Sequence, residues 1–293
     1  MAIAKESGYF TNSDDTKIFT HVWKIEGDWK PKALVFIAHG VAEHCLWYTK
    51  VAEILVNIGC LVFSHDHVGH GQSEGDRVHI ETFSTYISDV FQHCDKKRDE
   101  YPGLPLFMIG HSMGGAIAVM CGLERAKYFE GIVLIAAAIV ASPEALSPFR
   151  LYLATLLSWL WPQCPVGWMA TEVVTRNLQV VERYKNDPLV WHGGLKAKWG
   201  LCMLDAMNRI QENFEQIEWP VLILHGDTDK IVDVSGATLM NEKIRSKDKT
   251  LKVYTGFYHQ LHSEPGEDGE RVRQDIKEWI EQRMSPVVQS EIN

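Results

Sequence analysis

The sequence predicts an α/β fold, in which helices flank a mainly parallel central sheet and a helical insertion forms a cap. Three observations support this prediction. Short, continuous apolar runs recur along the chain, as in strands that are buried on both faces. Longer stretches with helical periodicity separate these runs, which is typical of βα units. Residues 140–219 interrupt the alternation, because this block is rich in Leu and Trp and lacks a clear buried strand.

The predicted elements follow in chain order. Lys17–Ile25 is expected to add antiparallel strands at the edge of the sheet. The predicted buried strands are Ala33–Ala38, Cys60–Ser64, Leu104–Ile109, Gly131–Ala137, Val221–Leu224 and Leu251–Tyr254. The predicted helices are Trp47–Ile58, Thr82–Asp99, Met113–Arg125, Val234–Arg245 and Gly269–Arg283. We therefore expect residues 1–139 and 220–293 to form one core, and residues 140–219 to form the helical cap.

Charge and cysteine content limit the possible partners and compartments. The chain carries 29 basic and 38 acidic residues, a net charge of −9, whereas nucleic-acid binding requires a basic face. The first ten residues lack the long apolar run of a signal peptide. We therefore expect a cytoplasmic protein that binds no nucleic acid and whose six cysteines are reduced thiols.

An apolar segment, Leu151–Trp161, resembles part of a membrane span. It is about half as long as the roughly 20 residues that a span needs, and Pro162 ends it. A helix there would be apolar nearly all round, with Thr155 and Ser158 as its clearly polar positions. We expect a lid that contacts the membrane surface peripherally, with Trp159 and Trp161 at the level of the lipid head groups. A buried cap helix or an oligomer contact is the alternative.

A serine nucleophile is predicted at Ser112. The sequence Gly110-His111-Ser112-Met113-Gly114 matches G-x-S-x-G, which is weak by itself. Here it follows a predicted strand and precedes a predicted helix, which is the strand–turn–helix context of a nucleophile elbow. A glycine-rich turn with a helix-capping serine is the structural alternative.

The general base and its acid are expected further along the chain, because this fold places them after the serine. Asp227, Asp229 and Asp233 follow one predicted strand. We favour Asp229, because Asp227 fits a turn and Asp233 fits a helix N-cap. His259 follows the next strand and is favoured as the base over His262, which is farther from the strand end.

Two backbone amides are expected to stabilise the oxyanion of acyl transfer. Met113 follows the nucleophile, and Val41 follows the pair His39-Gly40 in the loop after Ala33–Ala38. An ordinary strand-to-helix turn is the alternative for that loop. The sequence 65–70 (HDHVGH) resembles part of a metal-binding loop but lacks a further acidic ligand in register. We expect no metal and no other cofactor.

Together these residues resemble the α/β-hydrolase superfamily, and more narrowly the monoglyceride lipases. The matching segments are HGVAEH at 39–44, DHVGHGQSEG at 66–75, GHSMGG at 110–115, RNLQVVERYKNDPL at 176–189, HGDTDKIVD at 225–233 and YHQLH at 258–262. The G-x-S-x-G motif identifies only the superfamily, whereas the loop at 39–44 and the ending at 258–262 are more specific. One departure is Trp47, where this family often has arginine.

The resemblance implies hydrolysis of monoacylglycerol to a fatty acid and glycerol by Ser112, Asp229 and His259. It also suggests that Glu43, Tyr184 and His262 lie near the glycerol head group. A lysophospholipase or general carboxylesterase with the same catalytic residues remains an alternative. A more remote alternative is a protein that has the hydrolase fold but binds lipid without enzymatic activity. The sequence leaves the oligomeric state open.

Overall fold

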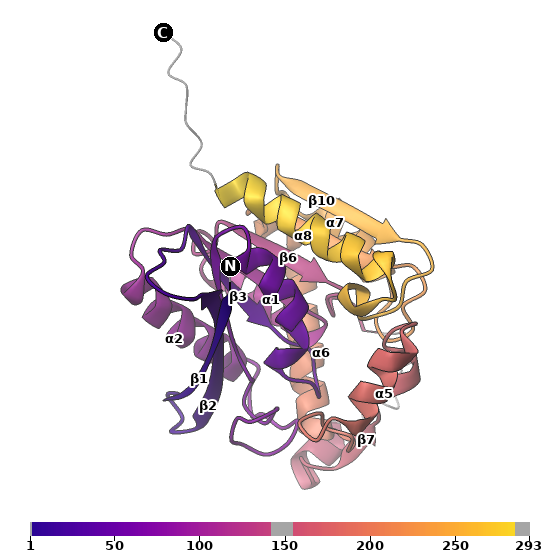
Figure 1. The fold of residues 1–293 in the computed structure, drawn as a ribbon. Helices are drawn as coiled ribbons and strands as arrows, with labels where there is room; N and C mark the ends of the chain where they lie inside the picture. Colours follow the sequence, from indigo (N-terminus) through magenta and orange to yellow (C-terminus); the bar gives the residue numbers. More distant parts are fainter. Residues whose placement is uncertain (1, 142–154, 285–293) are drawn as a thin grey trace.

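The computed structural model describes residues 2–141 and 155–284. Its centre is an eight-stranded sheet in the order β1-β2-β4-β3-β5-β6-β9-β10, with helices on both sides (Figure 1). A separate pair, β7 and β8, lies outside this sheet. The strands are β1 (Ile3–Thr11), β2 (Lys17–Ile25), β3 (Ala33–Ala38), β4 (Cys60–His65), β5 (Leu106–His111), β6 (Gly131–Ile135), β7 (Pro165–Gly167), β8 (Leu195–Lys196), β9 (Val221–Gly226) and β10 (Lys249–Tyr254).

Strand direction decides where functional side chains can gather. From β4 to β10 every neighbouring pair in the sheet is parallel, while β1 and β2 extend one edge by antiparallel pairing. The carboxyl ends of β3, β5, β9 and β10 therefore meet at the same edge of the sheet. In open α/β sheets this is the edge where ligands bind.

Helices cover both faces of the sheet. They are α1 (Thr49–Val56), α2 (Ser84–Glu100), α3 (Met113–Glu124), α5 (Leu178–Asn186), α6 (Ala197–Glu212), α7 (Ser235–Lys243) and α8 (Glu267–Met284), and residues 155–160 are also helical. Short 3₁₀ helices are η1 (Cys45–Tyr48), η2 (Thr171–Val173), η3 (Phe214–Gln216) and η4 (Leu261–Ser263).

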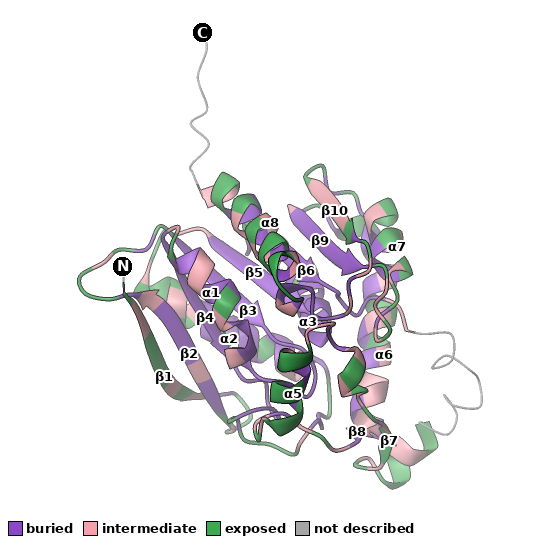
Figure 2. Cartoon of the chain, turned by 45° about the vertical axis from the view of Figure 1, so that its right-hand side comes forward, coloured by how far each residue is buried: buried purple, intermediate pink, exposed green. Residues whose placement is uncertain are grey.

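The alternation of side chains along each strand produces two hydrophobic cores. On β3, Leu34 and Phe36 pack in the core that includes α2, α3, α6 and α7. Val35 and Ile37 point to the opposite face, whose core includes α1 and α8. Every residue of β3, β4, β5, β6 and β9 is buried, and these strands run through the centre of Figure 2. This burial explains why their sequences are continuous rather than alternating apolar runs.

The predicted α/β architecture is confirmed, with small shifts at the ends of elements. The strand predicted over Leu104–Ile109 extends over Leu106–His111, so it runs directly into Ser112. The helix predicted over Trp47–Ile58 divides into η1 and α1. The edge strand β1 was not predicted, because its residues are not an apolar run and several of them are exposed.

The predicted cap, residues 140–219, is described except for residues 142–154, and these include the first four residues of the predicted lid segment Leu151–Trp161. Its described part contains β7, η2, α5, β8, α6 and η3. Segment 174–191 is joined to the core by backbone hydrogen bonds, from Trp191 N–H to the carbonyl of Ala42 (2.7 Å) and from Gln260 N–H to the carbonyl of Val174 (2.6 Å). None of the described helices is long and apolar enough to span a membrane.

Candidate active site

Ser112 lies in a strained turn between β5 and α3. Its backbone φ is 54° and its ψ is −118°, a conformation that non-glycine residues rarely adopt. Neighbouring chain segments approach this turn too closely for larger residues. A Cβ atom at Gly114 would lie 2.1 Å from the carbonyl oxygen of Ala38, and one at Gly110 would lie 2.2 Å from that of Gly114. The sequence G-x-S-x-G therefore matches a real steric requirement.

Backbone hydrogen bonds hold the turn in place. Ser112 N–H donates to the carbonyl of Ile135 (3.0 Å), and the carbonyl of Ser112 accepts from Ala138 N–H (3.0 Å). Met113 is the first residue of α3, and the N–H groups of a first helical turn have no acceptor within the helix. Ser112 thus stands at the N-terminus of a buried helix, where negative charge is favoured.

Asp229 and His259 form a buried pair beside this edge of the sheet. Oδ2 of Asp229 lies 2.7 Å from Nδ1 of His259, and its Oδ1 accepts hydrogen bonds from Ile231 N–H (2.8 Å) and Val232 N–H (3.0 Å). Burial alone would raise the pKa of Asp229. The charge of His259 and hydrogen bonds, including one from His225, outweigh burial and hold the pKa below its usual range. Asp229 is therefore an ionised acceptor for His259.

His259 is poised as a neutral imidazole. Burial lowers its pKa below 6.5, and this outweighs the opposite influence of Asp229. Its Nδ1 faces Asp229, and its Nε2 is buried without a hydrogen-bond partner among the described residues. A neutral base with one nitrogen oriented and the other open is what proton transfer from a hydroxyl requires.

The other two aspartates make different contacts. Asp227 is exposed and accepts a hydrogen bond from Gly256 N–H (2.6 Å), so it holds a turn. Asp233 accepts from Ser235 N–H (2.8 Å) just before α7. The turn contact of Asp227 is the one expected from sequence, whereas the N-cap of α7 is Val234, one residue after Asp233.

The loop after β3 lies directly against the nucleophile turn. A Cβ atom at Gly40 would lie 3.3 Å from Cβ of Ser112. Ala42 has a positive φ of 67°, so the loop is also strained. Val41, the predicted donor, and Met113 are both buried. The structure thus brings the loop that carries Val41 next to Ser112 and Met113.

The predicted head-group residues come from three segments. Tyr184 of α5 is buried, and its ring centre lies 5.3 Å from that of Trp47. The guanidinium carbon of Arg183 lies 4.5 Å from the centre of the Trp47 ring. His262 stacks on Tyr48 at 4.9 Å, and its two ring nitrogens are buried without hydrogen-bond partners among the described residues. Burial lowers the pKa of His262 to about 3, so it is neutral. Glu43 is buried beside His111.

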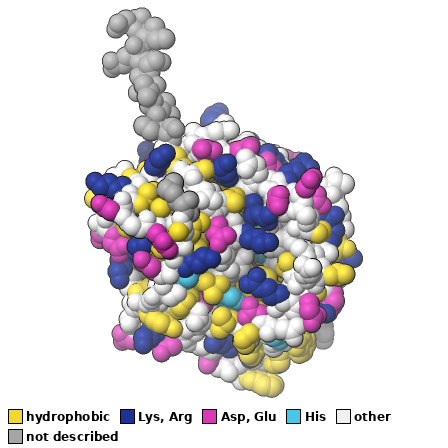
Figure 3. Space-filling model, in the orientation of Figure 1, with side chains coloured by type: hydrophobic (Ala, Val, Ile, Leu, Met, Phe, Trp, Pro, Cys, Tyr) yellow, Lys and Arg dark blue, Asp and Glu magenta, His cyan; other side chains and the backbone are white. Residues whose placement is uncertain are grey.

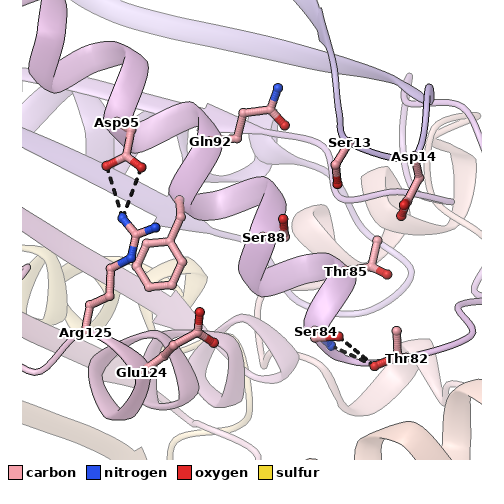
Figure 4. A pocket seen from close by; sticks show the side chains of 11 residues that line it. Ser13, Asp14, Thr82, Ser84, Thr85, Ser88, Gln92, Asp95, Glu124 and Arg125 are labelled. Carbon is pink, nitrogen blue, oxygen red and sulfur yellow. Dashed lines mark hydrogen bonds and ion pairs between the residues drawn. The ribbon is translucent and has the colours of Figure 1, made fainter.

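A pocket of about 530 Å³ adjoins this group. It lies between α1, α5, η4 and α8, and Trp47, Arg183 and His262 are among its lining residues. A second pocket, of about 590 Å³, is lined mainly by α2 and carries hydroxyl and charged side chains, including Ser84, Thr85 and Asp95 (Figure 4). None of the predicted site residues lines the second pocket.

The histidine-rich loop after β4 is a structural turn. Asp66 accepts hydrogen bonds from Cys45 N–H and Gln72 N–H, each at 2.8 Å. His67 N–H donates to Nε2 of His39 (2.9 Å), which joins this loop to the loop of Val41. Within residues 2–141 and 155–284, no three His, Cys, Asp or Glu side chains are arranged to hold a metal ion.

Exposed apolar side chains gather at one end of the molecule. In Figure 3 they form the lower edge, where Figure 1 places β7. Trp159 is 81% exposed, and the other large exposed apolar residues of the described cap are Leu156, Leu160, Trp161, Val166, Trp168 and Leu178.

Three residues around the site were not singled out from sequence. They are Tyr48, His111 and Gln260, which contact the carboxylate of Glu43. His111 and Gln260 each adjoin a predicted catalytic residue, and this adjacency is the one signal that could have identified them.

Comparisons with known proteins identify the family of the chain. Residues 29–266 match the family model described as serine aminopeptidase, S33. The chain is 41% identical to the monoglyceride lipase of Mus musculus over 94% of its own length and 91% of that protein. It is also 41% identical to the monoglyceride lipase of Homo sapiens, over 94% and 90% of the two chains. Its fold is similar to the crystal structure of the Paleococcus ferrophilus monoacylglycerol lipase, with a TM-score of 0.78 and 28% identity over 97% and 100% of the chains.

Proposed function

The chain belongs to the monoglyceride lipase family of α/β hydrolases, and we propose that it hydrolyses monoacylglycerols to a free fatty acid and glycerol through an acyl-enzyme on Ser112. The observation that carries this proposal is the buried pair of Asp229 and His259, 2.7 Å apart, at the sheet edge where Ser112 occupies its strained turn. The identity with monoglyceride lipases supports the choice of substrate class.

In the first half of the reaction, Oγ of Ser112 attacks the ester carbonyl while Nε2 of His259 takes its proton. The N–H groups of Val41 and Met113 hold the oxyanion of the tetrahedral intermediate. As this collapses, His259 gives the proton to the departing glycerol oxygen. Asp229 holds the imidazole in the correct tautomer and stabilises its positive charge.

In the second half, water replaces the alcohol. His259 takes a proton from the water as its oxygen attacks the acyl carbonyl, and then returns the proton to Oγ of Ser112 as the fatty acid leaves. One ester and one water are consumed, and one acid and one glycerol are released. The lowered pKa of His259 supports this role, because only the neutral ring can start either half.

Glycerol recognition is proposed for the polar group around the pocket of about 530 Å³. His262 lines this pocket, and its two buried ring nitrogens have no hydrogen-bond partner among the described residues, so it is the first group proposed to contact a free glycerol hydroxyl. Tyr184 is the second group expected there. Glu43 is the third residue expected near the head group. Loss of monoacylglycerol preference over an ethyl ester of the same acid in Tyr184→Phe would support this pocket.

Substrate collection is proposed for the cap, which we take as residues 140–219. Monoacylglycerols partition into lipid, and the exposed Trp159 and Trp161 can enter a neutral lipid surface at the head-group level. The net charge of −9 makes an ionic attraction to anionic lipid unfavourable, so the contact should be hydrophobic.

The proposed function is tested by labelling and by a lipid panel. A fluorophosphonate should label the chain, and Ser112→Ala should abolish labelling and lower kcat by several orders of magnitude while the fold is kept. Purified protein should hydrolyse monoacylglycerol faster than diacylglycerol or lysophospholipid. Labelling that survives Ser112→Ala would overturn the nucleophile, and a preference for lysophospholipid would overturn the substrate class.

A further inference from the structure

Glu43 is a buried carboxylate at the junction of the three segments that carry the proposed reaction groups. Its side chain is 2% exposed. Burial would raise its pKa, but hydrogen bonds from His111 and Tyr48 and the charge interaction with His111 outweigh burial and keep the pKa lowered. A carboxylate that stays ionised when buried must be held by donors, since leaving it unpaired is strongly unfavourable.

The donors come from the loop of Glu43 itself and from two distant parts of the chain. Oε1 accepts from Gly40 N–H (2.7 Å) and from the Tyr48 hydroxyl, and it lies 3.2 Å from Nδ1 of His111. Oε2 accepts from Nε2 of Gln260 (2.9 Å). The carboxylate therefore joins the loop after β3, the end of β5 and the loop after β10.

Three of these four contacts, those of Gly40, His111 and Gln260, are one residue away from a group with a role in the proposed reaction. Gly40 precedes the oxyanion donor Val41. His111 precedes the nucleophile Ser112, and Gln260 follows the base His259. His111 strengthens the connection, because its Nε2 lies 3.3 Å from the carbonyl oxygen of His259 and its Nδ1 lies 2.7 Å from the hydroxyl of Tyr48.

We propose that Glu43 is a positioning residue, whose carboxylate holds Val41, Ser112 and His259 in register by binding their sequence neighbours. This proposal rests on the proposed function, because it assumes ester hydrolysis by Ser112, but it does not depend on which alcohol leaves. Glu43 acts through the protein, because both its oxygens are occupied by protein groups. A displacement of about 1 Å in such groups can lower a rate by about 100-fold.

The decisive variant is Glu43→Gln in the full chain. It preserves size but turns one oxygen into an NH₂ donor, which must face Gly40 N–H, the Tyr48 hydroxyl or the Gln260 amide. We expect kcat to fall by about 100-fold on a short p-nitrophenyl ester and on monoacylglycerol alike, with KM within about twofold of the wild-type value. The rate of labelling by a fluorophosphonate should fall in parallel, because labelling needs the nucleophile and oxyanion groups but no glycerol.

Gln260→Met provides a milder second variant. It removes the donor to Oε2 alone, and Oε1 of Gln260 has no hydrogen-bond partner among the described residues that would be lost with it. We expect a fall of about tenfold in kcat on both esters, without a change in KM. This variant keeps the proposal testable if Glu43→Gln does not fold.

Asp89→Asn is the matched control for the loss of a buried carboxylate. Asp89 of α2 is 1% exposed and accepts a hydrogen bond from Asn12, and neither residue contacts a proposed reaction group. It should leave kcat and the labelling rate unchanged.

The outcomes separate the proposal from its alternatives. If Glu43→Gln raises KM for monoacylglycerol alone and leaves the soluble ester and the labelling rate unchanged, Glu43 contacts the alcohol and positioning is wrong. A wild-type chain that cleaves the soluble ester but no monoacylglycerol would overturn the proposed function. The labelling rate and the soluble ester would still decide the role of Glu43.

Discussion

His44 of the loop after β3 lies 2.9 Å, through its Nε2, from Oδ2 of Asp187 at the end of α5. This contact joins the cap to the loop of the proposed oxyanion donor. The backbone bond from Trp191 to Ala42 joins the same two segments. Burial would raise the pKa of Asp187, but the hydrogen bonds from His44 and from Leu189 N–H hold it below its usual value. Asp187 and Trp191 of the predicted cap thus hold the loop that carries Val41.

Asp187→Ala should therefore impair chemistry even on a small ester that does not need the cap for recognition. Without the His44 contact the loop is less firmly held, and we expect kcat to fall by about tenfold on p-nitrophenyl acetate. Glu182→Ala, on the exposed face of the same helix, is the control and should be neutral. An unchanged kcat for Asp187→Ala would mean that the Trp191 backbone bond and the loop's own contacts are enough to hold the loop in place.

The choice among three aspartates can be tested by amide substitutions. Asp229→Asn should lower kcat by about 10⁴-fold, because the imidazole loses its orienting acceptor and adopts the wrong tautomer. Asp227→Asn and Asp233→Asn should change kcat by less than about threefold, since their hydrogen bonds are to nearby groups of their own turns and not to a proposed reaction group. Steady-state kinetics on a soluble ester would measure all three, and a large loss in Asp227→Asn would refute the assignment.

The pH dependence of activity should report the lowered pKa of His259. The protonated ring cannot accept a proton, so kcat/KM should decline on the acidic side, with a midpoint below 6.5. Because Asp229 raises this pKa against burial, Asp229→Asn should move the residual acidic midpoint to still lower pH. A wild-type midpoint above 6.5 would contradict the neutral, buried base.

Lipid contact predicts a difference between two kinds of substrate. The double substitution Leu156→Ser and Trp159→Ser should reduce binding to neutral vesicles and hydrolysis of vesicle-borne monoacylglycerol, while hydrolysis of a short soluble ester survives. Wild-type binding should change little with salt, because it is hydrophobic. Tyr9→Ser, an exposed aromatic residue of the edge strand β1, is the control. Equal losses on both substrates would indicate damage to the fold and exclude docking.

Stability should respond to pH through Asp89. Burial raises its pKa to about 7 from an ordinary 3.8. The folded state therefore binds this proton more tightly than the unfolded state, so the associated stability is complete below about pH 4 and is lost as pH rises through 7. Asp89→Asn should raise Tm at pH 8, by roughly 2–4 °C for each kcal/mol by which the free energy of unfolding increases. The gain in Tm should shrink toward pH 4. Thermal unfolding at several pH values would measure it, and an equal gain at every pH would contradict the prediction.

Much of the fold was predictable because burial leaves a local pattern. The strands β3, β4 and β9 lie inside the sheet, away from its edges, so each contains a continuous run of at least four apolar residues. The strand β1 lies at an edge and is half exposed, and its sequence therefore resembles that of a surface loop.

The site also has a part that could be predicted from the sequence and a part that could not. Ser112 stands in a motif whose glycines are required locally, and Asp229 and His259 follow predicted strands, so chain order was enough to pair them. The contacts of Glu43 could not be predicted, because His111 is 68 residues away and Gln260 is 217 residues away. Such contacts arise only when the carboxyl ends of several strands meet at one edge.

The helix α6 lies within the predicted cap, residues 140–219, but it also packs on the central sheet. In the sequence it lies between β6 and β9, which are neighbouring parallel strands of the sheet. Its residues Met203, Ala206 and Ile210 pack in the same core as α3. The insertion therefore returns to the sheet through the crossover helix that any such β–α–β unit needs. A chimaera that exchanges substrate preference with a relative should accordingly be spliced before α6. Replacing the whole of 140–219 would remove core side chains, so the transplanted segment would have to bring a complementary crossover of its own.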